Sequence, residues 1–161
     1  MDIPYDPLDV SDFIVSFSEC FSPTLAKLHV DFDLGPIHRS ANSGFALGFD
    51  TLAPLLSFSH LRDLDLDCIC TSAISDASLK TMARSLPQLE NFYFGCGARW
   101  LVPPSLIFIG LAHFIHYCRY LRSIGMPLSA CAVDTDSEPF SETIPNEKIT
   151  IIFFRSSISL P

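Results

Sequence analysis

One short pattern occurs five times along this chain, with apolar residues at the first, fourth and sixth positions of a six-residue segment. Each occurrence alternates in the manner of a β-strand, and the stretches between them are mostly helical in pattern. The segments begin about 36, 28, 32 and 28 positions apart, a spacing that indicates stacked repeats rather than one compact globule. They are Leu25/Leu28/Val30, Leu61/Leu64/Leu66, Leu89/Phe92/Phe94, Leu121/Ile124/Met126 and Ile149/Ile152/Phe154.

One strand and one helix per unit is the layout of a leucine-rich-repeat solenoid. We therefore expect an α/β fold in which the five strands form one parallel sheet in chain order, with the helices on one face. Residues 1–161 are predicted to form a single domain of about five irregular repeats, with irregular loops at 33–49 and 129–147. Because every unit repeats the same apolar offsets, stacking should bury one column of side chains, Leu28, Leu64, Phe92, Ile124 and Ile152. The strand at 149–154 would have an uncovered edge, so we expect a segment of a longer array or a truncated gene product.

Helix signals separate the strands. They are a phenylalanine face (Phe13, Phe17 and Phe21) within 8–21, a short helix capped by Asp50, a helix capped by Ser75 or Asp76 and stopped by Pro87, and a helix that starts at Pro103-Pro104. The last of these helices should present one continuous apolar face, made of Ile107, Leu111, Phe114, Cys118 and Leu121.

Charge and cysteine content restrict the partner and the compartment. The chain has 18 Asp plus Glu against 10 Lys plus Arg, and both nucleic acid and anionic membranes require a cationic surface, so neither is expected as a partner. Residues 1–4 show no signal-peptide pattern, so the six cysteines are expected to be reduced thiols in a cytoplasmic or nuclear protein. The uncharged stretch between Arg99 and Arg119 has a helical part, 105–120, shorter than the roughly 20 residues that span a bilayer, which favours a buried helix.

Several units share more than their period. They include Leu61-Arg-Asp-Leu-Asp-Leu-Asp-Cys68, Ile74–Leu79, Leu86–Phe92, Cys118-Arg-Tyr-Leu121 and Pro145–Ile152. Together they resemble the leucine-rich repeats of fungal, basidiomycete-like F-box proteins, over roughly residues 9–158. In that family an N-terminal F-box docks the adaptor of a ubiquitin ligase and the repeats hold the substrate, so the resemblance implies substrate recognition. No F-box is expected in this chain, because Met1 to Asp12 lacks a Leu-Pro-x-Glu-like opening, and adaptor binding would need an F-box upstream.

The triplet Asp63, Asp65 and Asp67 is the sharpest local feature. Such carboxylates could hold a divalent cation or supply a nucleophile beside a phosphate site. The three residues alternate with Leu64, Leu66 and Cys68, however, which places them on the solvent face of one strand, where solenoids bind partners. We favour this second reading, and the metal-dependent enzyme stays as the alternative.

Two further groups are predicted to belong to the core. Cys68 and Cys96 occupy the same inward position, seven residues after the first leucine of units two and three. His113, His116 and Cys118 lack the paired cysteines or i, i+4 histidines of usual zinc sites, so helix packing is favoured over a metal. We predict no metal and no cofactor.

These observations favour a protein-binding repeat module over an enzyme, since no phosphate loop or nucleophile elbow occurs. Tyr93 and Phe153 are the candidate aromatic anchors, and the acidic triplet favours a basic protein partner. A degenerate or truncated repeat fragment without its own partner is the other alternative. The predicted concave binding face consists of Lys27, His29, Asp31, Arg62, Asp63, Asp65, Asp67, Glu90, Asn91, Tyr93, Arg122, Thr150, Ile151, Phe153 and Arg155.

Overall fold

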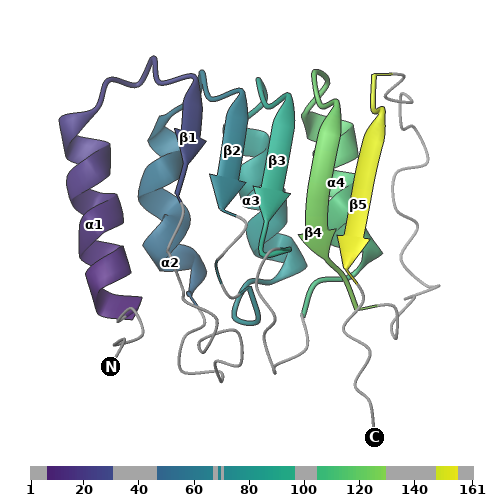
Figure 1. Ribbon diagram of the computed structural model, residues 1–161, viewed down its shortest axis with the longest axis horizontal. Coiled ribbons are helices and arrows are strands. Elements are labelled where there is room, and N and C mark those ends of the chain that lie inside the picture. The colour runs from purple at the N-terminus through teal and green to yellow at the C-terminus, as the bar shows by residue number, and fades with distance from the viewer. Residues whose placement is uncertain are drawn as a thin grey trace, which may run out of the picture.

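The strands of the chain form one parallel sheet in chain order, as the repeat predicts. The computed structural model describes residues 7–30, 47–66, 69, 71–96, 105–129 and 148–155. Within them the fold is α/β, with one five-stranded sheet in the order β1-β2-β3-β4-β5 and parallel pairing throughout (Figure 1). The strands are β1 (Lys27–His29), β2 (Asp63–Leu66), β3 (Asn91–Phe94), β4 (Ser123–Pro127) and β5 (Ile151–Arg155).

The register of the sheet aligns the predicted apolar column. Leu28, Leu64, Phe92, Ile124 and Ile152 are successive partners across the five strands. The first four are buried, but Ile152 is 46% exposed, so the prediction of burial is wrong at the last position. A central unit of a stack has neighbours on both sides, whereas β5 is the last described strand and pairs with β4 alone.

The same backbone contact sets this register at every step of the sheet. The carbonyl of the residue just before a strand accepts two N–H groups from the next unit, at 2.7–3.1 Å. The four acceptors are Ala26, Arg62, Glu90 and Arg122. Because both bonds must form together, a slip by one residue would break the pair and turn the apolar side chains to the wrong face.

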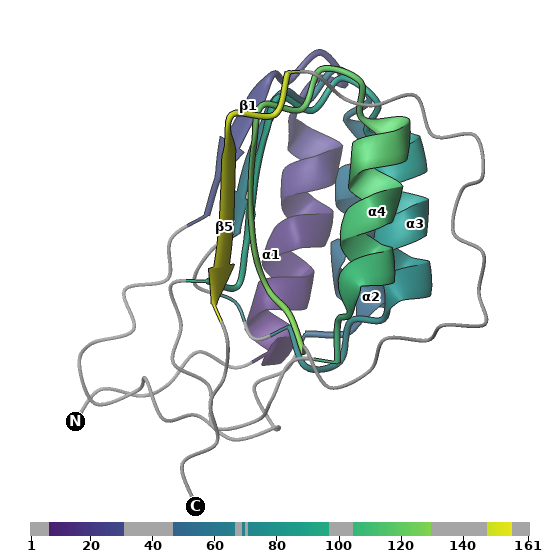
Figure 2. The same ribbon diagram turned by 90° about the vertical axis from the view of Figure 1, so that its right-hand side faces the viewer.

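The described helices all lie on one side of the sheet (Figure 2). They are α1 (Pro7–Cys20), α2 (Phe49–Leu52) with the 3₁₀ segment η3 (Ala53–Ser57), α3 (Asp76–Ser85) and α4 (Phe108–Tyr117). Along the layer α1 contacts α2 and η3, η3 contacts α3, and α3 contacts α4. No helix in the described ranges is long and apolar enough to cross a membrane.

Two of the predicted helix starts are wrong. Asp50 does not cap α2: Gly48 is the N-cap residue, and Asp50 lies in the first turn. The helix predicted from Pro103-Pro104 begins later, at Phe108 with Ile107 as N-cap, and the two prolines lie outside the described residues. Ile107 is accordingly half-buried rather than part of the inward face.

The start of α3 follows the prediction and also determines how α4 begins. Ser75 is the N-cap, and its hydroxyl accepts a hydrogen bond from Ser78 N at 3.2 Å. Asp76, in the first turn of α3, reaches the next unit, where Oδ1 accepts from Ile107 N at 3.2 Å. The carboxylate thereby caps α4 from outside that helix. Gly110 allows this approach, because a Cβ there would lie 2.4 Å from Asp76 Oδ1 and 2.7 Å from a Leu79 methyl.

The core between the two layers is continuous and aromatic at its centre. Phe92 stacks on Phe114 of α4 at 4.3 Å between ring centroids, and Phe94 lies 5.4 Å from Phe92. Cys118 donates its thiol hydrogen towards the carbonyls of Ala83 and Leu86, at 3.6 and 3.5 Å. Burial raises the pKa of the Cys118 thiol to about 12, so this cysteine is a core residue, and Cys96 is buried as well.

Helix α1 covers the first unit with a face different from its phenylalanine row. Among the α1 side chains that the structure describes, Val10 and Ile14 are buried, while Phe13 and the following Phe21 are each half-exposed. Phe17 lies between the two sides: it stacks on Phe21 at 4.3 Å and meets Phe58 of the next unit edge-on at 5.8 Å. The i, i+4, i+8 row therefore follows the flank of α1 rather than its contact surface.

Candidate partner-binding face

The face of the sheet opposite the helices carries the polar residues of the first three strands; we call it the open face. Lys27, His29, Asp63, Asp65, Asn91 and Tyr93 alternate along β1, β2 and β3 with the buried leucines and phenylalanines. Strand alternation sends the two sets in opposite directions. The register then lines the polar residues up in two rows across the strands.

The first row joins Lys27, Asp63 and Asn91. Lys27 Nζ lies 2.7 Å from Asp63 Oδ2, and the amide of Asn91 donates to Asp63 Oδ1. Partial burial by itself raises the pKa of Asp63, but the hydrogen bonds from Asn91 and Lys27 and the charges of Lys27 and Arg62 outweigh it, so this pKa lies below the usual 3.8. The hydrogen bond to Asp63 also raises the pKa of Lys27 above 10.5. Asp63 is therefore a carboxylate at neutral pH, held from both sides.

The second row joins His29, Asp65 and Tyr93. His29 Nδ1 lies 2.8 Å from Asp65 Oδ2. Tyr93 extends over the next strand, where its hydroxyl and the Ser123 hydroxyl are 2.5 Å apart. Gly125 leaves room for that ring, because a Cβ at Gly125 would lie 2.8 Å from Tyr93 Cδ1. The Ser123 hydroxyl and the space at Gly125 thus hold the ring of Tyr93 in place.

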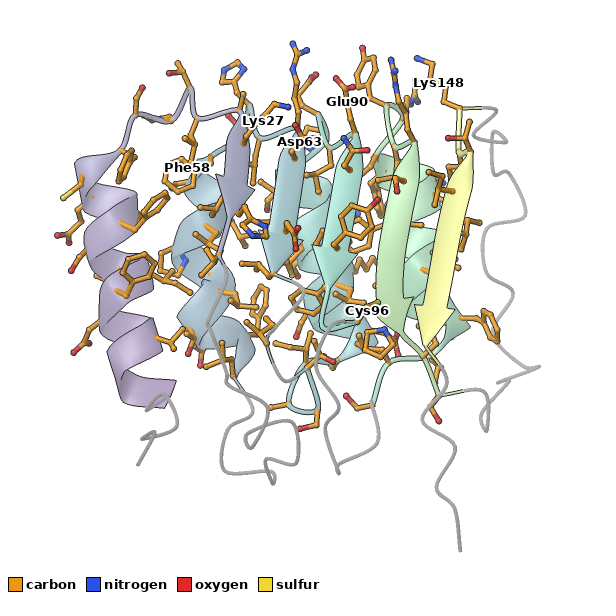
Figure 3. The ribbon with its side chains drawn as sticks, in the orientation of Figure 1. Lys27, Phe58, Asp63, Glu90, Cys96 and Lys148 are labelled. Carbon is orange, nitrogen blue, oxygen red and sulfur yellow. The ribbon has the colours of Figure 1, made fainter. Side chains whose placement is uncertain are left out.

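A third set of charges lies just before the strands. Glu90 is shared by two arginines, with Arg62 Nη1 3.4 Å from Oε1 and Arg122 Nε 3.6 Å from Oε2. Figure 3 shows Glu90 at the end of the sheet where the strands begin, on the same edge as Lys27 and Lys148. Lys148 Nζ lies 4.8 Å from the centroid of the Tyr120 ring.

The two rows surround a hollow of about 460 Å³ on the open face. A volume of this size is in the range of pockets that accept a few side chains or a small ligand. Its floor and walls come from three strands, and its lining residues are Lys27, Leu28, His29, Asp63, Leu64, Asp65, Asn91 and Tyr93.

The structure brings most of the predicted site together. His29, Asp63, Asp65, Asn91 and Tyr93 line the hollow. Arg62, Glu90 and Arg122 form the neighbouring charged group. Asp31 and Asp67 lie outside the described residues, and Phe153 pairs with Gly125 in the backbone register while its side chain is outside the description.

One residue that contacts the candidate face escaped the prediction. Ser123 occupies the same register position as Asp63 and Asn91, but the predicted binding face does not include it. Its hydroxyl fixes Tyr93, and the aligned position in the repeat was the signal that could have found it.

Two of the three carboxylates of the metal alternative already contact nitrogen atoms, and the third, Asp67, lies outside the described residues. Both oxygens of Asp63 contact a neighbouring nitrogen, and Asp65 Oδ2 contacts His29. Over the described parts of the chain, no group of three His, Cys, Asp or Glu side chains is placed to hold a metal ion.

No protein-family model matches the chain, and comparisons with curated proteins and with solved structures give no match.

Proposed function

We propose that this chain is a protein-binding leucine-rich-repeat module that holds an extended segment of a partner protein on its open face. The observation that carries the proposal is the hollow over β1, β2 and β3, on the side of the sheet that the described helices leave uncovered. Solenoids of stacked strand–helix units commonly bind partners on such a strand surface.

The side chains of the hollow suit peptide recognition. Tyr93 offers a large amphipathic surface whose position is fixed by Ser123, so little conformational entropy is lost on binding. His29, Asp65 and Asn91 add hydrogen-bonding groups around it. Most of the lining side chains are polar or charged, so the hollow offers a partner mainly hydrogen bonds and charge, with the Tyr93 ring as its largest apolar surface.

The resemblance of the repeats to those of F-box proteins gives the proposal its cellular setting. In that setting the chain would act as the substrate-recognition part of a ubiquitin-ligase receptor, in the cytoplasm or the nucleus. Contact with the ligase adaptor would depend on an F-box encoded upstream of Met1.

Selection of peptides against the chain tests the proposal directly. Binders would be selected from a displayed library of random peptides, and their affinity measured against single variants of the folded chain. Tyr93→Ala and His29→Ala should each weaken the selected peptides by about tenfold or more, as expected for residues at the centre of an interface. Thr81→Ala, on the exposed side of α3, is the control and should change nothing.

The opposite pattern would reject the proposal. If selected peptides ignored Tyr93 and His29 but lost affinity with Thr81→Ala, the helix layer would be the binding surface. If no peptide bound, the alternative of a repeat fragment without its own partner would be favoured. A rise in melting temperature with magnesium or manganese that disappeared in Asp63→Asn would instead favour the metal-dependent enzyme.

A further inference from the structure

The turns that lead into the five strands make an edge of the open face that we call the entry rim. In the described residues it comprises 22–27, 58–63, 86–91, 118–123 and 148–151. Its charged members are five cations, Lys27, Arg62, Arg119, Arg122 and Lys148, and two carboxylates, Asp63 and Glu90. The rim thus carries a net charge of +3, whereas the whole chain carries −8. The rim is therefore of opposite sign to the whole molecule.

Exposure strengthens this difference in sign. The side chains of Lys27, Arg62 and Arg122 are 80%, 61% and 64% exposed, whereas those of Asp63 and Glu90 are 25% and 26% exposed. The carboxylates lie low against the sheet, and the cations extend past them. An approaching partner therefore meets positive charge first.

The central group of the rim is arranged to accept another anion. Glu90 is one carboxylate between two guanidinium groups, and its contacts of 3.4 and 3.6 Å are long for charged hydrogen bonds. Each guanidinium has five N–H donors, and these contacts use Nη1 of Arg62 and Nε of Arg122. Among the residues that the structure describes, each arginine thus retains donors for a second carboxylate.

We propose that the entry rim binds an acidic extended segment of the partner protein, whose carboxylates reach Arg62 and Arg122 on either side of Glu90. This inference rests on the proposed function and specifies the chemistry of its ligand. The prediction of a basic partner came from the triplet Asp63, Asp65 and Asp67; in the structure Asp63 contacts Lys27 and Asp65 contacts His29, while Asp67 lies outside the described residues.

The strand spacing gives the expected spacing of the acids. Arg62 and Arg122 precede β2 and β4, which are two strand positions apart, or about 9.6 Å. In a polyproline II segment, residues i and i+3 lie on one side and about 9.3 Å apart. A peptide with glutamate at every third position therefore matches the two arginines.

The test uses the full chain and a fluorescein-labelled peptide of three Glu-Pro-Pro units, with Gln-Pro-Pro and Lys-Pro-Pro versions as charge controls. We expect the glutamate peptide to bind in fluorescence anisotropy and the other two to bind at least about tenfold more weakly. The double variant Arg62→Gln, Arg122→Gln should weaken the glutamate peptide by about tenfold or more, and 0.5 M salt should mask the difference. Lys80→Gln on α3 removes a cation away from the rim and should leave binding unchanged.

The direction in which Glu90→Gln changes peptide affinity distinguishes an acidic partner from a basic one. Removing the competing carboxylate should tighten binding of the glutamate peptide. A site for a basic partner would instead bind the lysine peptide and lose that binding in Glu90→Gln.

Three results would overturn the proposal. They are a lysine peptide that binds more tightly than the glutamate peptide, a glutamine peptide that binds as well as the glutamate peptide, and an oligothymidylate of the same charge that binds as tightly as the glutamate peptide and depends equally on Arg62 and Arg122. If library-selected peptides lose affinity with Tyr93→Ala but not with the rim variants, the proposed function stands and the rim proposal fails. If the glutamate peptide loses affinity with the arginine variants but no peptide loses affinity with Tyr93→Ala, the rim proposal stands and binding in the hollow fails.

Discussion

The two faces of the sheet follow different rules, although their residues alternate along the same strands. On the helix side, Leu64, Phe92 and Ile124 are fully buried and fit against the helix layer. On the open side, Asp63 and Asn91 are held by hydrogen bonds and ion pairs with neighbours on the adjacent strands and remain partly exposed. The helix side therefore carries the stability of the fold, and the open side can change its side chains at small cost.

The largest expected effect comes from the centre of the helix side. Phe92→Ala removes a fully buried ring that stacks on both Phe114 and Phe94, and it should reduce the free energy of unfolding by about 3–5 kcal/mol. Tyr93→Ala, one residue further on the open face, is the matched control and should cost less than half as much. Urea denaturation of both variants measures this difference. Equal costs would show that the two faces contribute alike.

The next effect tests how tightly neighbouring helices approach. Gly110→Ala would place a Cβ against Asp76 and Leu79, so the α3–α4 contact must open, at a cost of about 1–3 kcal/mol. Gly48→Ala places the same methyl where no atom lies within 4 Å, and it should change stability by less than about 1 kcal/mol. Similar melting temperatures for the two variants would mean that the helix layer is looser than the structure indicates.

Sequence reasoning was strongest where one physical rule acts alone. Parallel pairing, strand order and the aligned column follow from the period and from alternation, and the structure has them across all five strands; only the burial of the column fails, at Ile152. Prediction was weaker at helix starts, because α4 is capped by Asp76, a residue 31 positions earlier, and no local signal reveals a cap supplied from another helix.

The open face was predicted by residue but not by its interactions. Strand alternation alone predicts Asp63 and Asp65 to be solvated charges, although the repeat places Lys27 and His29 at the same offsets in the preceding unit. The polar positions form columns across the strands just as the apolar ones do, and these columns pair Lys27 with Asp63 and His29 with Asp65. The exposure of Ile152 depends instead on what lies beside the last described strand, which the period within a unit cannot determine.

A smaller effect concerns Asp76, the carboxylate that joins two helices of the covered side. Desolvation raises its pKa above 3.8, despite the backbone hydrogen bonds from Ile107 and Gly110. Asp76→Ala loses the acceptor and should cost about 1–2 kcal/mol, whereas Asp76→Asn keeps an acceptor without the buried charge and should cost less.

The pH dependence of this pair of variants has a definite sign. Above pH 3.8 the folded wild type holds a proton on Asp76 more tightly than the unfolded chain does, so raising the pH through the folded pKa reduces its stability relative to Asp76→Asn. Urea denaturation at pH 4 and pH 7 measures this. If the free energy of unfolding of the wild type instead rose relative to that of Asp76→Asn from pH 4 to pH 7, the hydrogen bonds to the carboxylate would outweigh its desolvation.

The smallest effect is expected at Asp63, on the open face. Asp63→Asn removes the charge that Lys27 contacts but keeps an oxygen for Asn91, and pairs this exposed typically contribute about 0.2–1 kcal/mol. Because the folded pKa of Asp63 lies below 3.8, its contribution is complete above that pH and is lost as the pH falls through the folded value, the opposite sign to Asp76. Asp12→Asn, an exposed change of the same charge on α1, is the control.

Urea denaturation of the wild type and of these two variants at pH 7 and pH 3, in low and high salt, measures the size of the stability change and its sign with pH. A loss above about 2 kcal/mol at pH 7 that salt did not reduce would mean that the open face is part of the structural framework, which would leave less of it available to a partner.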